Sequence, residues 1–153
     1  MARAAVEGLR PVAAQKEQPL ALAEPAEELP PVSADPERLR QVFDNLISNA
    51  LKYSPPGGGV TVSLGGAGGW AYAEVRDSGP GLGPADFARI FAPFQPLSAK
   101  PTGRGEDSTG LGLFIARELL NLQGGRLEVQ SQPGQGSVFR VLLPVAARAA
   151  VAV

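Results

Sequence analysis

One long segment with clear boundaries constrains the fold more than any other part of this sequence. Asp35 followed by Pro36 is a strong helix start, because Asp can cap free N–H groups and Pro suits the first helical position. At the other end, the run SPPGGG at 54–59 cannot continue a helix. The sequence therefore predicts one helix from about Pro36 to Tyr53.

Glycine and proline also divide the rest of the chain into short elements. The glycine-rich segment 65–69 is expected to be the loop of a hairpin. The other expected elements are helices at 2–16, near 84–90 and from about 110 to before 124, and strands around 20–23 and at 60–64, 70–77, 126–130 and 138–143.

This order mixes hairpins with helices and does not alternate strand and helix strictly. It favours an α+β two-layer sandwich, with a mixed, mostly antiparallel sheet covered on one face by about three helices. A chain of 153 residues is about one domain. We expect this domain over residues 1–144 and a C-terminal tail over 145–153.

Composition excludes several functions. A net charge of −1 provides no basic field for nucleic acid or an anionic membrane. With no cysteine, no apolar run near ~18 residues and no signal-peptide pattern, the chain is expected to be soluble and cytoplasmic. The chain also lacks histidine, the commonest general base and metal ligand, so any catalysis must use other groups.

A polar stripe is expected beside the apolar face of the long helix. It includes Asn45, Asn49 and Lys52. Taken alone, the stripe fits an ordinary solvated helix face. The two asparagines favour another interpretation, since Asn is a poor helix former whose amide oxygen suits Mg²⁺.

The strand at 70–77 is expected to alternate, with Asp77 at the end of its small apolar face. A partly desolvated carboxylate needs a partner, so Asp77 either caps the following turn or accepts hydrogen bonds from a ligand. Gly79, Gly81 and Gly83 follow at alternate positions, where the backbone can approach a flat ligand closely.

A third pattern opens the helix predicted from about residue 110. Free N–H groups at a helix start, with glycines permitting close approach, can bind phosphate, although a plain helix cap explains the pattern equally well. Neither a Walker motif nor a dinucleotide fingerprint is present. The candidate phosphate-binding residues are Ser108, Thr109, Gly110, Leu111 and Gly112.

The ordered combination of these motifs resembles the catalytic, ATP-binding domain of sensor histidine kinases, within the gyrase-like (Bergerat) ATPase and kinase group. The resemblance extends over about residues 2–144. The matching segments are 45–54 for the N box, 77–83 for the first glycine box, Phe91 and Phe94 for the F box, 110–112 for the second glycine box, 134–137 for the last glycine turn and 139–144 for the closing strand.

The resemblance implies a role for each residue. Asn49, with Asn45, would hold Mg²⁺ on the triphosphate of ATP, and Lys52 would pair with phosphate oxygens; these three are the expected catalytic residues. Tyr53 would lie beside the adenine or ribose, and Asp77 would accept the adenine amino group.

The resemblance also implies the rest of the nucleotide site. Gly79 and Gly81 would shape the pocket floor, and Ser137 would support a water network at Asp77. The residues 108–112 would bind phosphates once the segment 95–109 closes as a lid. Two departures concern this segment: Gln95-Pro96 stand where the family often has an arginine, and Arg104 is the only arginine in the lid.

A kinase is favoured over an ATPase. Related hydrolases carry a glutamate base where this chain has Asn45, which cannot usefully accept a proton. The resemblance implies a phosphoacceptor histidine on a separate dimerisation domain absent from this chain, a response regulator downstream, and a monomeric domain from a homodimeric kinase. The parent could be a membrane-bound sensor with this domain in the cytoplasm.

Two other functions fit the same motifs: a nucleotide-sensing module without catalysis, and an anti-sigma-type serine kinase or free-standing ATPase. A further alternative concerns Phe114, expected on the side of its helix away from the core. It is either a partly buried aromatic under the lid or, with Phe94, an apolar patch that docks the histidine-bearing domain.

Overall fold

The computed structural model describes residues 1–87, 89–93 and 111–146. The helices are α1 (Ala2–Gln15), α2 (Pro36–Tyr53), α3 (Pro84–Phe87) and α4 (Gly112–Asn121). The strands are β1 (Leu20–Leu22), β2 (Val60–Ala67), β3 (Trp70–Arg76), β4 (Arg126–Ser131) and β5 (Ser137–Pro144).

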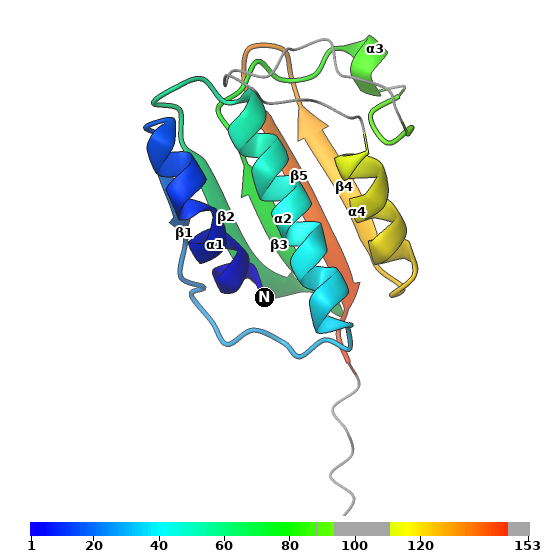
Figure 1. Cartoon of the computed structure of the whole chain (residues 1–153). Coiled ribbons are helices and arrows are strands. Elements are labelled where there is room, and N and C mark those ends of the chain that lie inside the picture. The colour runs from blue at the N-terminus through cyan, green and yellow to red at the C-terminus, as the bar shows by residue number, and fades with distance from the viewer. Residues whose placement is uncertain (88, 94–110, 147–153) are drawn as a thin grey trace, which may run out of the picture.

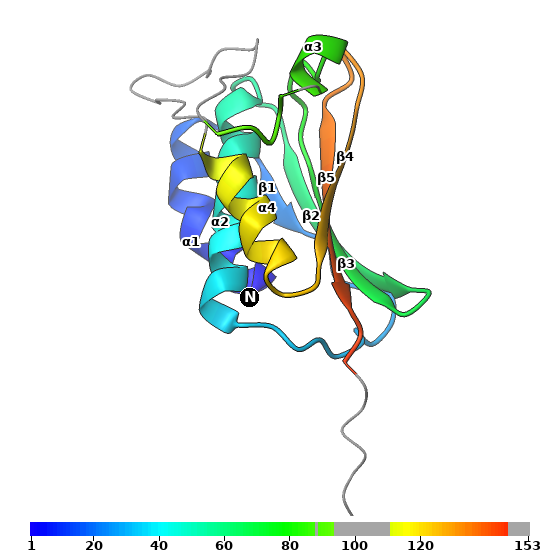
Figure 2. The same cartoon turned by 90° about the vertical axis from the view of Figure 1, so that its right-hand side faces the viewer.

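The strands form one sheet in the order β1-β2-β3-β5-β4. Only β1 and β2 pair in parallel among the described strands; the other three pairs are antiparallel. Figure 2 shows α1, α2 and α4 together on one side of the sheet, whereas the other side carries no helix among the described residues. The prediction of a two-layer, mostly antiparallel sandwich is confirmed.

Helix α2 begins and ends where the sequence predicts. The side chain of Asp35 accepts hydrogen bonds from the backbone N–H groups of Glu37 (3.0 Å) and Arg38 (3.3 Å), so it caps the helix. Figure 1 shows α2 lying between α1 and α4 across the sheet. Its apolar side is buried, with Val42, Leu46, Ile47 and Ala50 completely inaccessible to solvent.

The expectation that 65–69 forms the hairpin loop was wrong. Strand β2 continues through Gly65 and Gly66 to Ala67, so the turn consists of Gly68 and Gly69 alone. Their φ angles of 60° and 83° lie in the left-handed region that a tight two-residue hairpin turn requires. Gly65 stays in the strand because the Tyr72 ring lies against it, in the space a side chain would fill.

Other boundaries shift by a few residues. Helix α3 ends at Phe87, shorter than the predicted 84–90, and α4 begins at Gly112. Pairing at the end of β5 continues into the predicted tail, because Val145 N–H donates to Gly69 O (2.9 Å) and Ala146 N–H to Pro31 O (2.8 Å).

The hydrophobic core lies between the helices and the sheet. The predicted alternation of β3 is confirmed: Ala73, Val75 and Asp77 are buried on the helix side. On the opposite face the guanidinium of Arg126 lies 4.9 Å from the centroid of the Trp70 ring. Among the described residues, no helix is both long enough and apolar enough to cross a membrane.

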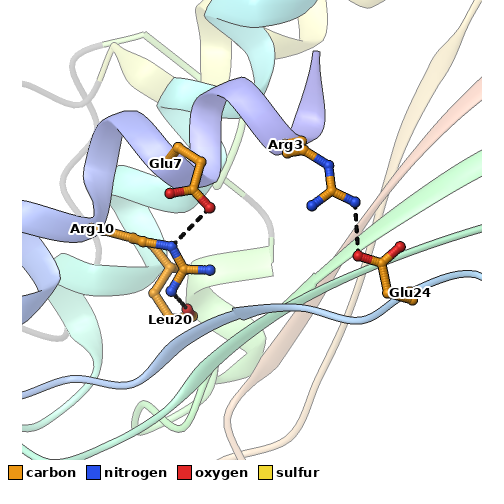
Figure 3. A network of polar contacts seen from close by, with 5 residues as sticks. All are labelled: Arg3, Glu7, Arg10, Leu20 and Glu24. Atoms are coloured by element: carbon orange, nitrogen blue, oxygen red, sulfur yellow. Dashed lines mark hydrogen bonds and ion pairs between the residues drawn. The ribbon is translucent and has the colours of Figure 1, made fainter.

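Helix α1 is fixed to β1 and to the segment after it. The Arg10 guanidinium donates to Leu20 O (2.8 Å), and Arg3 pairs with Glu24 (2.7 Å) (Figure 3). Both ion-pair partners of the second contact are largely exposed, so it contributes little stability. The contact to the Leu20 carbonyl links the helix directly to the strand.

Candidate functional site

A buried carboxylate marks one end of the sheet. Asp77 follows β3 directly and is 8% exposed. Its Oδ1 accepts hydrogen bonds from Gly79 N–H (2.8 Å) and Ser137 N–H (3.2 Å). Asp77 N–H in turn donates to Ser137 O (2.9 Å). One carboxylate oxygen is therefore fixed by the backbone, and no hydrogen bond to Oδ2 is found within the described ranges.

The two interpretations of Asp77 are thus compatible. Asp77 does cap its own turn through Gly79. Burial raises the pKa of Asp77 above its usual range, while the hydrogen bonds from Gly79 and Ser137 oppose this shift. A desolvated carboxylate with an oxygen left over can accept hydrogen bonds from a ligand.

The turn before Ser137 packs directly on the backbone of Asp77. Gly136 has a φ angle of 74°, and a Cβ there would lie 2.2 Å from Asp77 O. Only glycine fits this position without displacing the strand end. A Cβ on Gly81 would likewise lie 2.0 Å from Gln132 O, whereas one on Gly83 would contact nothing. Close approach is therefore required at Gly81 and not at Gly83.

A small cavity opens in front of Asp77, with a volume of about 10 Å³. This is space for about one water molecule. A planar base as large as adenine can enter only if the walls move apart. The cavity is lined by Asn49, Tyr53, Asp77, Pro80, Gly81, Leu82, Ser137 and Phe139.

Helix α2 supplies the other wall of this cavity through Asn49 and Tyr53. Asn45 lies one turn earlier on the same side and is half-buried. Its Nδ2 is buried and has no hydrogen-bond partner among the described residues. Such a group is costly to bury unless a ligand or water satisfies it. Lys52, also half-buried, is on the last turn of the helix.

These residues fit a magnesium ion carried by a ligand and not one held by protein alone. The described part of the chain contains no group of three or more His, Cys, Asp or Glu side chains that could hold a metal. Mg²⁺ is commonly held by one or two protein oxygens together with phosphate oxygens of the substrate. The buried, unpaired amide of Asn45, near Asn49, offers side-chain oxygen or nitrogen according to its rotation.

Several predicted residues fall outside the described ranges: Phe94, Ser108, Thr109 and Gly110, together with the lid at 95–109 and Arg104. Leu111 and Gly112 are described at the start of α4, where no side chain caps the helix and the first turn carries no acidic residue. Such a helix end favours an anion. Their contact with phosphate remains a prediction.

The F-box phenylalanine within the described ranges, Phe91, is packed on the core. The guanidinium of Arg117 on α4 lies 5.2 Å from its ring centroid, so the two segments are linked by a cation–π contact. Phe114 is half-buried. Both alternatives for Phe114 stay open, since Phe94 and the lid are outside the described residues.

Sequence reasoning missed Ser131, the last residue of β4. Its hydroxyl lies 2.8 Å from three groups: the N–H of Leu82, the carbonyl of Gly136 and the Ser137 hydroxyl. It therefore links the cavity loop to the turn that holds Asp77. The two predicted strands around 131–136 could have suggested it, because Ser131 and Ser137 are opposite each other in a hairpin of that length.

Cavity size alone does not locate this site. Larger cavities of about 540 Å³ and 270 Å³ lie by the β2–β3 hairpin and the segment before α2. Both are lined by residues such as Leu29, Pro30 and Tyr72, and neither contains Asn49, Tyr53 or Asp77. The chemistry predicted from the sequence converges only at the small cavity.

Residues 34–147 match the family model described as histidine kinase-, DNA gyrase B-, and HSP90-like ATPase. The chain belongs to this family. Within it, the chain is the ATP-binding catalytic domain of a histidine kinase, as its relatives and neighbouring structures are.

Two relatives illustrate the likeness. The alginate biosynthesis sensor protein KinB of Pseudomonas aeruginosa is 40% identical over 119 residues, covering 78% of this chain and 19% of that protein. The histidine protein kinase DivJ of Caulobacter vibrioides is 41% identical over 122 residues, covering 76% of this chain and 20% of that protein. The chain thus spans about a fifth of the length of these relatives.

Solved structures agree with the sequence comparison. Full-length ShkA in complex with AMPPNP matches 97% of this chain and 30% of that chain, with a TM-score of 0.80 and 36% identity. The mycobacterial sensor histidine kinase MprB matches 94% of this chain and 92% of that chain, with a TM-score of 0.77 and 27% identity.

Proposed function

We propose that this domain binds Mg-ATP and transfers its γ-phosphoryl group to a histidine on a separate dimerisation domain. The observation that carries the proposal is Asp77, a buried carboxylate with one oxygen held by Gly79 and Ser137 and the other left over for a ligand. An adenine amino group is a donor that this oxygen can accept. The AMPPNP complex of ShkA supports a nucleotide at the equivalent place.

The chain's own contribution to the transfer is positioning and charge neutralisation. Asp77 would fix the base, Tyr53 would contact the adenine or ribose, and Lys52 would neutralise charge on the phosphates. Asn49 and Asn45 would hold the metal on the triphosphate, and Mg²⁺ would neutralise the charge that develops on the phosphate oxygens. The free N–H groups at Leu111 and Gly112 would receive phosphate oxygens.

In the transfer itself, a histidine nitrogen of the partner domain forms a bond to the γ-phosphorus as the bond to the ADP oxygen breaks. The nucleophile cannot come from this chain, which has no histidine. Water is a poor substitute because Asn45 is at the position where related hydrolases carry a glutamate base. The proposed partners are therefore the dimerisation domain of the same kinase and a downstream response regulator, all in the cytoplasm.

The test combines this chain with a separately produced cognate helical domain that carries the histidine. Mg-ATP labelled in the γ-phosphate should give acid-labile phosphate on the helical domain and none on this chain. Asp77→Asn should abolish the transfer. Tight binding of Mg-ATP without transfer would identify a nucleotide-sensing module instead, and hydrolysis without any acceptor would identify an ATPase.

A further inference from the structure

The last turn of α2 carries Tyr53, a wall of the nucleotide cavity, and ends at Ser54. The final carbonyl groups of a helix have no partner within the helix. Here the following prolines prevent the chain from continuing the helix. The position of this turn therefore depends on what binds its free carbonyls.

The side chain of Gln18 binds this helix end. Its Nε2 lies 2.8 Å from Ser54 O, 3.1 Å from Leu51 O and 3.3 Å from Pro55 O. Lys16 Nζ also donates to Leu51 O, at 2.5 Å. Gln18 is only 4% exposed, although glutamine is normally a surface residue. A buried amide donor therefore joins three consecutive parts of the helix end.

The backbone after α1 is shaped to bury this side chain. Glu17 has a φ angle of 52° and is the one non-glycine residue with a positive φ in the described ranges. L-residues adopt this conformation at a cost. Gln18 N–H then donates back to Ala13 O (2.9 Å). Because α1 is itself tied to β1 through Arg10 (Figure 3), Gln18 acts from a fixed element.

The opposite side of the same turn meets the loop after Asp77. The Ser54 hydroxyl accepts a hydrogen bond from Ser78 N–H (3.3 Å), and the Ser78 hydroxyl donates to Gly59 O (3.0 Å). Tyr53 O lies so close to Gly79 that a Cβ there would be 2.9 Å away. Any shift of this turn is therefore passed to the backbone that holds Asp77.

We propose that Gln18 is a positioning residue for the nucleotide, acting through the last turn of α2 on Tyr53 and on the loop at 78–79. The proposal rests on the function proposed above. An amide is suited to this place because it offers donors to several carbonyls without a buried charge. Lys16 supports the same turn from a half-buried position.

The test compares Gln18→Met, which keeps the length of the side chain and removes its donors, with Gln15→Met, an exposed control on α1. ADP affinity is measured by calorimetry well below the unfolding temperature of each variant. Gln18→Met should weaken ADP binding about fivefold, the equivalent of one lost hydrogen bond. It should also shift the backbone amide resonances of Ser78 and Gly79 in the free protein, whereas Gln15→Met should change neither.

A lower unfolding temperature for Gln18→Met with unchanged ADP affinity and unchanged Ser78 and Gly79 resonances would overturn the proposal, since the role would then be structural only. If Gln18→Met does not fold, Lys16→Met decides through the same two resonances, which must move. Failure of the unaltered chain to bind ADP would overturn the proposed function, while the resonances would still show whether Gln18 positions the loop.

Discussion

The two halves of the candidate site are held in different ways. In the base half, Asp77 and Ser137 are buried and joined by backbone and side-chain hydrogen bonds. In the phosphate half, Asn45 and Asn49 are half-buried, and the Asn45 Nδ2 has no partner among the described residues. One half is complete without a ligand, and the other has a polar group that a ligand could satisfy.

This difference teaches where binding energy is prepared in advance. A fixed acceptor such as Asp77 loses little entropy when a base binds, so it supports affinity and selection of the base. Groups that become ordered with the triphosphate instead make metal-dependent and phosphate-dependent contributions. Substitutions in the base half should therefore affect every adenine nucleotide, and substitutions in the phosphate half only the metal-dependent part.

The largest expected effect is that of Asp77→Asn, in the base half. It replaces Oδ2 with a donor that faces the donor of adenine, so ADP affinity should fall at least ~100-fold by calorimetry. The unfolding temperature at neutral pH should not fall, because burial disfavours the ionised Asp77. Glu128→Gln, exposed on β4, is the control and should bind ADP normally. Retained ADP binding in Asp77→Asn would refute the base half.

Gly136→Ala should next disturb the support of Asp77. The new Cβ would collide with Asp77 O at a positive φ, so the free energy of unfolding should fall by about 2 kcal/mol or more in urea denaturation. Gly134→Ala is a matched control, because Gly134 has a φ of 80° but nothing within 4 Å of its Cβ position. The control isolates the conformational cost, about 1 kcal/mol. Equal losses in the two variants would show that the contact with Asp77 is unimportant.

Asn49→Ala addresses the phosphate half. Magnesium should strengthen ADP binding to the unaltered chain, and this gain should shrink about tenfold in the variant. Affinity measured with a chelator should remain within about twofold, since no direct contact with the base is lost. Gln41→Ala, exposed on the same helix, should behave like the unaltered chain. A similar loss with and without magnesium would mean that the two halves are not separable.

Ser131→Ala should have a smaller effect. It removes the hydroxyl shared by Leu82, Gly136 and Ser137, so we expect a loss of about 1–2 kcal/mol in the free energy of unfolding. ADP affinity should fall a few-fold with and without magnesium alike. The exposed Ser33→Ala is the control. A loss confined to the magnesium-dependent part would place Ser131 in the wrong half.

The pH dependence should be the finest measure of the base half. Carbon NMR of the free protein should show Asp77 titrating above the usual range for an aspartate, since burial raises its pKa. Because the raised pKa belongs to the folded state, the contribution of Asp77 to stability should decline as the pH rises through it. Asp77→Asn should remove that part of the pH profile. A pKa below the usual range would mean that the backbone hydrogen bonds outweigh burial.

Much of the fold could be predicted because local signals agreed with one another. Asp35-Pro36 and the run at 54–59 set both ends of α2, and alternation along β3 placed Asp77 on the buried side. The hairpin failed because glycine composition suggests a loop, whereas packing of Tyr72 on Gly65 extends the strand. That contact crosses between strands and leaves no local signal.

The same distinction applies to the site. Asp77, Asn49, Tyr53 and Ser137 were predicted from motifs and do meet at one cavity, although their roles remain predictions. Ser131 and Gln18 were missed because their importance lies in partners far along the chain, at Leu82 and Ser54. Nothing in their immediate neighbours distinguishes them from surface residues.

The chain has a single tryptophan, Trp70, which begins β3 while Asp77 follows its end. At ~3.3 Å per residue, the two are about 23 Å apart. Its indole lies under Arg126 on the helix-free face of the sheet. Intrinsic fluorescence thus observes the far end of the strand, so an emission change on adding ADP would reveal deformation along the whole of β3. Constant emission would provide an internal optical baseline against which local rearrangement around the base can be measured.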